Sequence, residues 1–134
     1  MVFGESAEHK LALKKLEETV HPQIRTRIEE TIRSLRKSVS CELIILDAAL
    51  LLEAGWNEVC DLVFFIEVSE EIRMKRVIEN RHWTVDEFRK RELNQLSLQE
   101  KQSRADYTIE NNSDLLSAVD QLESCLKKHF QFNL

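Results

Sequence analysis

Two continuous apolar runs stand apart from the otherwise charged, helical pattern of the chain. The first, LIIL (43–46), ends on the lone carboxylate of Asp47 and lies within the stretch 41–56. The second is DLVFFIEV (61–68). Apolar runs without alternation are typical of strands that are buried on both faces, as in a parallel sheet covered by helices. A shorter third strand is predicted at 107–110 (YTIE).

Helical periodicity dominates the part of the chain before the first run. Apolar residues recur at spacings of three or four from Leu13 to Leu35, on both sides of Pro22. Because proline is tolerated in the first turn of a helix, we expect one helix to end near Val20 and a second to begin at Pro22. His21 would then lie at the junction, facing solvent or a cleft. On position alone, a histidine that fills a helix corner is the simpler interpretation.

Capping signals predict three further helices in the middle of the chain. Ser69 suits an N-cap, and the two glutamates after it favour a helix that runs to about residue 80 or 81. The sequences TVDE (84–87) and SLQE (97–100) both match the S/T-x-x-E capping box. We therefore expect a pair of short, polar helices there.

A last helix is predicted after the turn NNS (111–113). One face of it is apolar, and it ends in KKH (127–129), whose charges suit a helix C-terminus. Strands and helices thus alternate along the chain. This alternation predicts an α/β fold, with a small parallel sheet of about three strands flanked by helices.

Length and composition predict one globular domain, residues 1–134. Within it we expect a helical segment (2–40), an α/β core (41–68 and 105–129) and a connecting helix with an arginine-rich segment (69–104). Apolar residues make up 43% of the chain and charged residues 32%, as in ordinary globular proteins. The net charge of −5 argues against a nucleic-acid partner, because phosphate binding needs clustered cations.

Other classes of protein are disfavoured by what the sequence lacks. No apolar stretch approaches the ~20 residues that span a bilayer, so we expect no membrane partner, and residues 1–10 lack the features of a signal peptide. The three cysteines are widely spaced, which predicts reduced thiols in a cytoplasmic protein. The four histidines lack the spacing of a zinc site.

Two features suggest chemistry. Ligands of parallel sheets bind outside the carboxyl ends of the strands, where Asp47 would stand. The segment 73–104 is dense in arginine and too polar to be core. It is either a solvated helical face with acidic partners, such as Glu87 with Arg91, or a mobile lid that brings cations to a polyphosphate. The charge pattern alone favours the solvated face.

Several stretches together resemble dephospho-CoA kinases, the P-loop kinases that add the 3′-phosphate in the last step of coenzyme A synthesis. LEETVHPQIR (16–25) resembles the family's Leu-Glu…His-Pro-x-Ile-Arg signature. LDAALLLEAGW (46–56) resembles its Asp-x-Pro-Leu-Leu-Phe-Glu-x-Gly segment, with Ala49 and Leu52 in place of the usual proline and phenylalanine.

The resemblance continues into the second half of the chain. Arg81, and Arg91 with Gln95 four residues on, are similar to the family's lid. EKQSRADYTIENNS (100–113) is similar to its last strand and turn. These stretches occur in order and at the family's separations, over about residues 2–128, so the combination is specific.

The resemblance implies roles for residues in the first half of the chain. Asp47 would be the catalytic strand-end carboxylate, near Mg²⁺ or its water. His21 and Glu53 would line the dephospho-CoA side, to which the helical segment 2–40 would belong. Other interpretations stay open, because Asp47 could cap the following helix and Glu53 could be a surface charge.

The resemblance also implies that ATP and Mg²⁺ are the cofactors and dephospho-CoA the substrate. Arg81, Arg91 and Arg104 would be lid cations for the ATP phosphates, and Asn111 and Asn112 would lie by the adenine. The two asparagines could equally form only a turn.

The largest departure from the family is an absence. The family begins with a strand and a phosphate loop, G-x-x-x-x-G-K-S/T, and no such loop can be drawn among these 134 residues. We therefore expect a truncated P-loop kinase-like fold whose central P-loop strand is missing, so that the binding of ATP and Mg²⁺ by this chain is in question. The strands on either side must close on each other, pair with another chain or stay poorly ordered, which predicts self-association.

Two hypotheses about function follow. In the first, the chain is a truncated dephospho-CoA kinase that is inactive alone, because the loop that positions the phosphates is missing. In the second, it is a non-catalytic module that binds nucleotide or CoA, or that oligomerises, on the same scaffold. Thermal shifts with ATP–Mg²⁺ and with dephospho-CoA would separate the two, and the absence of a shift with either ligand would favour an inert fragment.

Overall fold

The computed structural model describes residues 7–38 and 42–130. The chain forms two compact units, Met1–Val59 and Cys60–Leu134, and each is described here by itself. Unit 1 contains the long helix α1 (Ala7–Leu35) and the short 3₁₀ helix η1 (Trp56–Val59). Among the described residues, no helix combines the length and the apolar character needed to cross a membrane. Cys60 and Cys125 are free thiols, and Cys41 lies outside the described residues.

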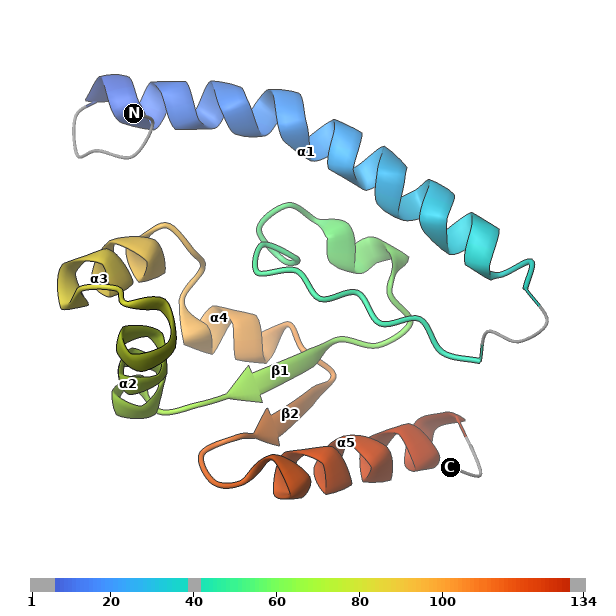
Figure 1. The fold of residues 1–134 in the computed structure, drawn as a ribbon. Helices are drawn as coiled ribbons and strands as arrows, with labels where there is room; N and C mark the ends of the chain where they lie inside the picture. The colour runs from blue at the N-terminus through green and yellow to red at the C-terminus, as the bar shows by residue number, and fades with distance from the viewer. Residues whose placement is uncertain (1–6, 39–41, 131–134) are drawn as a thin grey trace. The chain divides into compact units, whose positions relative to one another are not determined.

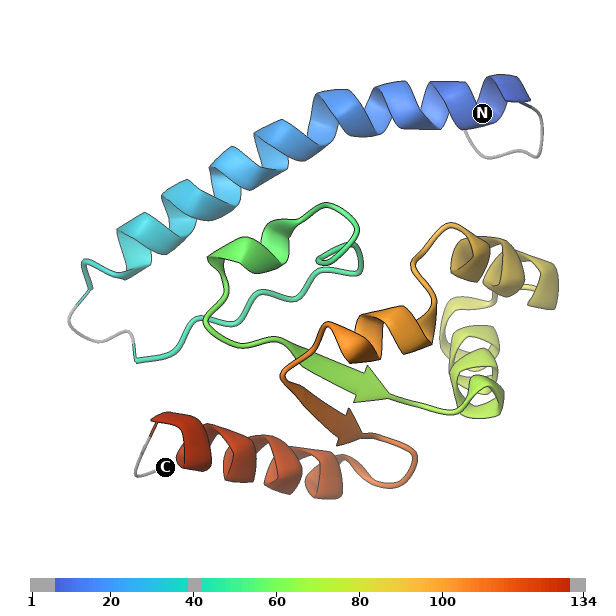
Figure 2. The ribbon, with the colours of Figure 1, turned by 180° about the vertical axis from the view of Figure 1, so that it is seen from behind.

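Helix α1 continues through Pro22, so the predicted break between two helices is wrong. Pro22 has no backbone N–H, which leaves the carbonyl of Glu18 without its helical partner. The helical hydrogen bonds resume beyond Pro22, and the hydroxyl of Thr26 donates to the carbonyl of Pro22 at 3.0 Å. The ribbon of α1 bends along its length, as expected of an interior proline (Figures 1 and 2). His21 therefore lies inside a helix instead of at a junction.

The predicted strand at 43–46 is also wrong. Residues 42–48 are extended, but none of them belongs to a strand. Ile45 is 76% exposed and Leu43 is 43% exposed, so the run is not buried on both faces. A strand needs a neighbouring strand to satisfy its backbone groups, and the described residues supply none to this run. Asp47 accordingly follows an extended segment instead of ending a strand.

A tight turn leads from the extended segment into η1. The N–H of Ala54 donates to the carbonyl of Leu50, and that of Trp56 to the carbonyl of Leu51. Gly55 closes the turn with a φ of 68°, a left-handed conformation that glycine adopts without steric cost. The turn delivers Trp56 into the interior of unit 1, where it is 7% exposed.

Unit 2 is built on a two-stranded parallel sheet. Strand β1 (Phe64–Glu67) pairs with β2 (Tyr107–Glu110), with Ile66 opposite Ile109. The α/β class and the parallel pairing are confirmed, but the described residues form two strands instead of about three. Because β1 pairs only with β2 in this part of the chain, self-association through its second edge remains a prediction.

Three helices connect the two strands, as the capping signals predict. They are α2 (Glu70–Arg81), α3 (Val85–Leu93) and α4 (Leu98–Ser103). The side chain of Ser69 accepts from the N–H of Ile72, and Thr84 and Glu87 form a complete capping box. Helix α5 (Leu115–Phe130) follows β2 and lies along it (Figure 1).

The core of unit 2 is small. It centres on Ile109 of β2, which is 2% exposed, with Ala118 and Leu126 of α5 and Phe88 of α3 also buried. Only part of the predicted apolar face of α5 is covered, because Leu115 and Leu116 are more than 70% exposed. The contact between β2 and α5 therefore dominates the hydrophobic stabilisation of this unit.

We predict that Ile109→Ala lowers the free energy of unfolding of unit 2 by about 2–4 kcal/mol, because it removes a fully buried side chain and leaves a cavity. Urea unfolding followed by circular dichroism measures this change. Ile66→Ala is the matched control: Ile66 is the register partner of Ile109 but is 48% exposed. An equal loss for the two variants would contradict this account of the core.

We predict that Pro22→Ala stabilises α1 by about 1–3 kcal/mol, because alanine restores the missing backbone hydrogen bond and has the highest helix propensity. Thermal unfolding and the helical signal in the far ultraviolet measure this effect. Gln23→Ala is the control, since it replaces the next residue, which is also exposed, without adding a backbone donor. A Pro22→Ala variant with unchanged or lower stability would argue that the interior proline fits α1 without cost.

Candidate functional site

Five of the six arginines of the 73–104 segment fall into two groups, and Arg89 is exposed. Three of them bind acceptors within unit 2: Arg73 pairs with Glu92, Arg104 pairs with Glu100, and Arg76 donates to the carbonyl of Asn111 at 3.1 Å. Arg104, an expected lid cation, is thus held by its own helix. These contacts give Arg73, Arg76 and Arg104 a structural role.

Arg81 and Arg91 behave differently, because both lie over the ring of Trp83. Their guanidinium carbons are 5.4 Å and 4.1 Å from the ring centroid, respectively. Neither guanidinium group forms an ion pair or a hydrogen bond with another described residue. Two of the predicted lid cations are therefore brought together around one half-buried aromatic side chain.

The junction between α2 and α3 creates this cluster. His82 ends α2 in the left-handed conformation, with φ 54° and ψ 31°, and its N–H donates to the carbonyl of Ile78. Thr84 then begins α3, accepting at its hydroxyl from the N–H of Glu87. A reversed turn followed at once by a cap leaves Trp83 between the end of one helix and the start of the next.

The pKa of Glu87 is lowered at this junction. Its carboxylate accepts from the N–H of Thr84 at 2.8 Å and from the hydroxyl of Thr84 at 3.0 Å. These two hydrogen bonds lower the pKa of Glu87, and the charges of Arg91 and Lys90 lower it further. Arg91 thus lies near a carboxylate without forming an ion pair with it.

Asn111 and Asn112, predicted to lie by the adenine, join three elements of unit 2. The N–H of Asn111 donates to the carbonyl of Glu67 at the end of β1. The side-chain carbonyl of Asn112 accepts from the N–H of Ser69, the N-cap of α2. These contacts fit the alternative interpretation of a structural turn, placed at the carboxyl end of the sheet.

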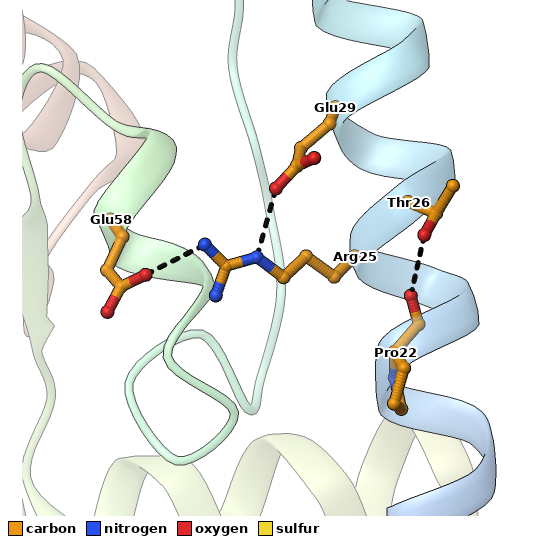
Figure 3. A network of polar contacts seen from close by, with 5 residues as sticks. All are labelled: Pro22, Arg25, Thr26, Glu29 and Glu58. Carbon is orange, nitrogen blue, oxygen red and sulfur yellow. Dashed lines mark hydrogen bonds and ion pairs between the residues drawn. The ribbon is translucent and has the colours of Figure 1, made fainter.

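Unit 1 holds the remaining candidates. The rings of His21 and Trp56 meet in a T-shaped arrangement, with their centroids 5.5 Å apart and their planes at 75°. One turn further along α1, Arg25 donates to Glu29 at 3.0 Å and to Glu58 of η1 at 2.8 Å (Figure 3). These charge-assisted hydrogen bonds raise the pKa of Arg25, so it stays charged. His21 and Arg25 therefore fasten η1 to the middle of α1.

Asp47 and Glu53 lie before and within the turn of unit 1. Asp47 is exposed and has no hydrogen-bond or ion-pair partner in the described part of the chain, so it caps no helix there. Glu53 is half-buried in the turn 51–55. Magnesium sites commonly use one or two carboxylates, with waters and substrate phosphates completing the octahedron. Asp47 could supply one such oxygen, and no cluster of three or more ligating side chains occurs among the described residues.

The candidates are thus distributed over both units. His21, Asp47 and Glu53 belong to unit 1, and the arginines and asparagines belong to unit 2. Sequence reasoning missed Trp83 and the contact of Arg25 with Glu58. A signal existed for Trp83, since it lies two residues after one predicted lid arginine. No sequence signal links Arg25 to Glu58, which is 33 residues away.

Comparison with known sequences points to a single family. Residues 2–117 match the sequence model of the family described as dephospho-CoA kinase. The dephospho-CoA kinase of Geobacillus kaustophilus is 34% identical over 132 residues, covering 96% of this chain and 61% of the relative. That of Lactobacillus johnsonii is 29% identical over 128 residues, covering 96% and 62%. The chain therefore spans about 60% of the length of these curated relatives.

Solved structures agree with the sequence comparison. A Thermus thermophilus protein of known crystal structure superposes with a TM-score of 0.73 at 27% identity, covering 90% of this chain and 61% of the other. The dephospho-CoA kinase from Campylobacter jejuni superposes with a TM-score of 0.58 at 25% identity, covering 93% and 61%. The fold is thus similar to that of a dephospho-CoA kinase.

We predict that Thr84→Ala raises the pKa of Glu87, because it removes one of the two hydrogen bonds that lower it. The carboxyl ¹³C signal of Glu87 followed against pH measures this change. In the wild-type protein, the lowered pKa contributes stability that is present above the unfolded pKa and is lost as the pH falls through the folded pKa.

Loss of the Thr84 cap also destabilises α3, by about 1 kcal/mol. Thr84→Ser is the control, because serine keeps the hydroxyl that caps α3 and binds Glu87. A Glu87 pKa that is the same in the alanine and wild-type proteins would refute the assigned role of the hydroxyl.

Proposed function

Because the chain belongs to the dephospho-CoA kinase family, we propose that it carries substrate-side and lid elements of an enzyme that transfers the γ-phosphate of ATP to the 3′-hydroxyl of dephospho-CoA. The match over residues 2–117 is the observation that carries this proposal. The pair of arginines around Trp83 supports it, because guanidinium groups with available donors suit phosphate oxygens.

The proposed roles follow the two units. In unit 1, the exposed carboxylate of Asp47 provides an oxygen for Mg²⁺ or its water, and His21 and Glu53 line the dephospho-CoA side. In unit 2, Arg81 and Arg91 bind phosphates of ATP. Arg104 contributes less than these two, because Glu100 already neutralises it.

Asn111 and Asn112 are proposed to act at the adenine through the backbone that they fix. Their side chains and amides already bind Ser69, Glu67 and Glu110. The turn that they form is therefore rigid. It follows β2 at the carboxyl end of the sheet, where ligands of α/β folds bind. Mg²⁺, when bound, would neutralise charge on the transferred phosphoryl group.

The chain alone is proposed to be inactive. Phosphoryl transfer depends on positioning and on stabilisation of charge, and in P-loop kinases backbone amides and a lysine of the phosphate loop provide much of both. The 134 residues contain no G-x-x-x-x-G-K-S/T. One cluster of lid arginines and one carboxylate cannot replace that loop, because removing a single electrostatic group already costs about 10²–10³ in rate.

A non-catalytic binding module is the second candidate. The Arg81–Trp83–Arg91 cluster favours it, because this cluster is complete without the phosphate loop. Thermal shifts with ATP–Mg²⁺ and with dephospho-CoA test it, since a ligand at 100 times its Kd stabilises the folded state by about 2.7 kcal/mol. A shift without any restorable phosphoryl transfer would favour this module over the kinase.

We predict that the purified chain phosphorylates dephospho-CoA no faster than background in the presence of ATP and Mg²⁺, because it lacks a phosphate loop. A coupled ADP-release assay measures this, with the Geobacillus kaustophilus relative as the positive control. A chimera that places a phosphate-loop segment of that relative before this chain should gain activity.

In that chimera, Asp47→Asn should lower kcat by about 10²–10³, because an electrostatic group at the transferred phosphate is lost. Asp120→Asn, on the exposed surface of α5, is the matched control and should leave kcat unchanged. A folded chimera that binds ATP but never phosphorylates dephospho-CoA would overturn the proposed function.

A further inference from the structure

Two like charges share one aromatic ring at the junction of α2 and α3. The guanidinium groups of Arg81 and Arg91 both lie within 5.5 Å of the Trp83 centroid, although cations repel each other. The electron-rich face of the indole offsets part of this repulsion. The Glu87 carboxylate, which lies near Arg91 without pairing with it, offsets a further part, and a bound anion would offset the rest.

The neighbouring arginines show that this arrangement is not a general consequence of crowding. Arg73 also lies over an aromatic ring, that of Phe88, at 5.5 Å, but Arg73 is paired with Glu92. Arg76 and Arg104 likewise bind protein oxygens. In the described chain, Arg81 and Arg91 combine an aromatic contact with the absence of a protein acceptor.

Contact with an aromatic ring suits an arginine that must still bind a ligand. A guanidinium group that stacks on a ring keeps its N–H donors in the guanidinium plane, directed away from the ring. The donors therefore remain available for two hydrogen bonds to one phosphate. A carboxylate partner would occupy those donors, but the indole ring does not.

The backbone is bent in an uncommon way to bring Trp83 to Arg81. Residues two positions apart do not face each other on a regular helix. The left-handed conformation of His82 ends α2 between them, and for a residue with a side chain this conformation costs free energy. The capping box of Thr84 and Glu87 then starts α3, whose last turn carries Arg91 back to the ring.

We propose that Trp83 is a positioning residue that holds Arg81 and Arg91 as one donor set for adjacent phosphate groups of a nucleotide polyphosphate. This inference rests on the proposed function and adds a residue to it. The indole ring limits the side-chain freedom of both arginines before the ligand arrives. The ordering entropy is then lost on folding instead of on binding, which increases affinity.

Arginine side-chain NMR of the full chain tests this arrangement directly. In the wild-type protein, the Nε–H signals of Arg81 and Arg91 should be displaced by the indole ring, and added tripolyphosphate should move them. Arg89, exposed on the same helix and with no aromatic contact, is the internal control and should not respond. Signals of Arg81 and Arg91 that stay unmoved while tripolyphosphate binds would overturn the proposal.

Variants separate positioning from a merely structural role. Trp83→Leu should weaken tripolyphosphate binding, measured by calorimetry, by about 5–10-fold, because the two arginine side chains must then be ordered on binding instead of on folding. Trp83→Phe keeps a ring and should stay within about 2–3-fold of the wild type. Arg89→Ala removes one positive charge from the same helix and should change the affinity by less than about 2-fold, because an exposed charge in high dielectric contributes little. Arg91→Lys keeps the charge but loses the planar fork, so its affinity should fall as in Trp83→Leu.

The outcomes distinguish this inference from the proposed function. Equal affinity of Trp83→Leu and wild type overturns the positioning role alone, and leaves the activity of the chimera as evidence for the kinase assignment. Failure of the wild type to bind tripolyphosphate overturns the anion site itself. If Trp83→Leu does not fold, Trp83→Phe and the wild-type arginine signals still decide the question.

Discussion

The parallel pairing of β1 with β2 is the constraint on which unit 2 depends. Only four residues of each strand take part, so both ends of the ladder need support. At one end, Asp106 binds the N–H of Val63 through its carboxylate and the carbonyl of Val63 through its own N–H. At the other end, Asn111 binds the carbonyl of Glu67. Between them, Ile109 is buried and the rings of Phe64 and Tyr107 stack.

Parallel pairing also dictates the connection that carries the candidate site. Two parallel strands cannot be joined by a hairpin, so the chain must cross over and return to the end of the sheet where the first strand began. Helices α2, α3 and α4 form that crossover, and the Trp83 cluster lies at its first helix–helix junction. The turn of Asn111 and Asn112 ties the end of β2 to the N-cap of α2, so the base of the crossover is fixed while its outer part is polar and exposed. The proposed lid is thus anchored at its base by residues of the turn.

Local signals in the sequence predicted local structure well. Ser69, Thr84 and Ser97 each cap the predicted helix that follows, because a cap depends only on residues within one turn. The strand predicted at 43–46 does not form, because apolar character shows only that a segment can be buried, whereas a strand also requires a neighbour. The break predicted at Pro22 does not form either, because the helix-forming residues on both sides of it outweigh one missing hydrogen bond.

The candidate site shows the same division between local and non-local information. The sequence identified an arginine-rich segment but could not say which arginines are occupied, because Glu92 and Asn111 are 19 and 35 residues away from their partners. The fold determines which arginines have a protein acceptor. It neutralises Arg73 and Arg104 with carboxylates and gives Arg81 and Arg91 an indole ring instead. Since an ion pair uses up hydrogen-bond donors and a ring contact preserves them, the partner of each arginine is better evidence of its role than its position in the sequence.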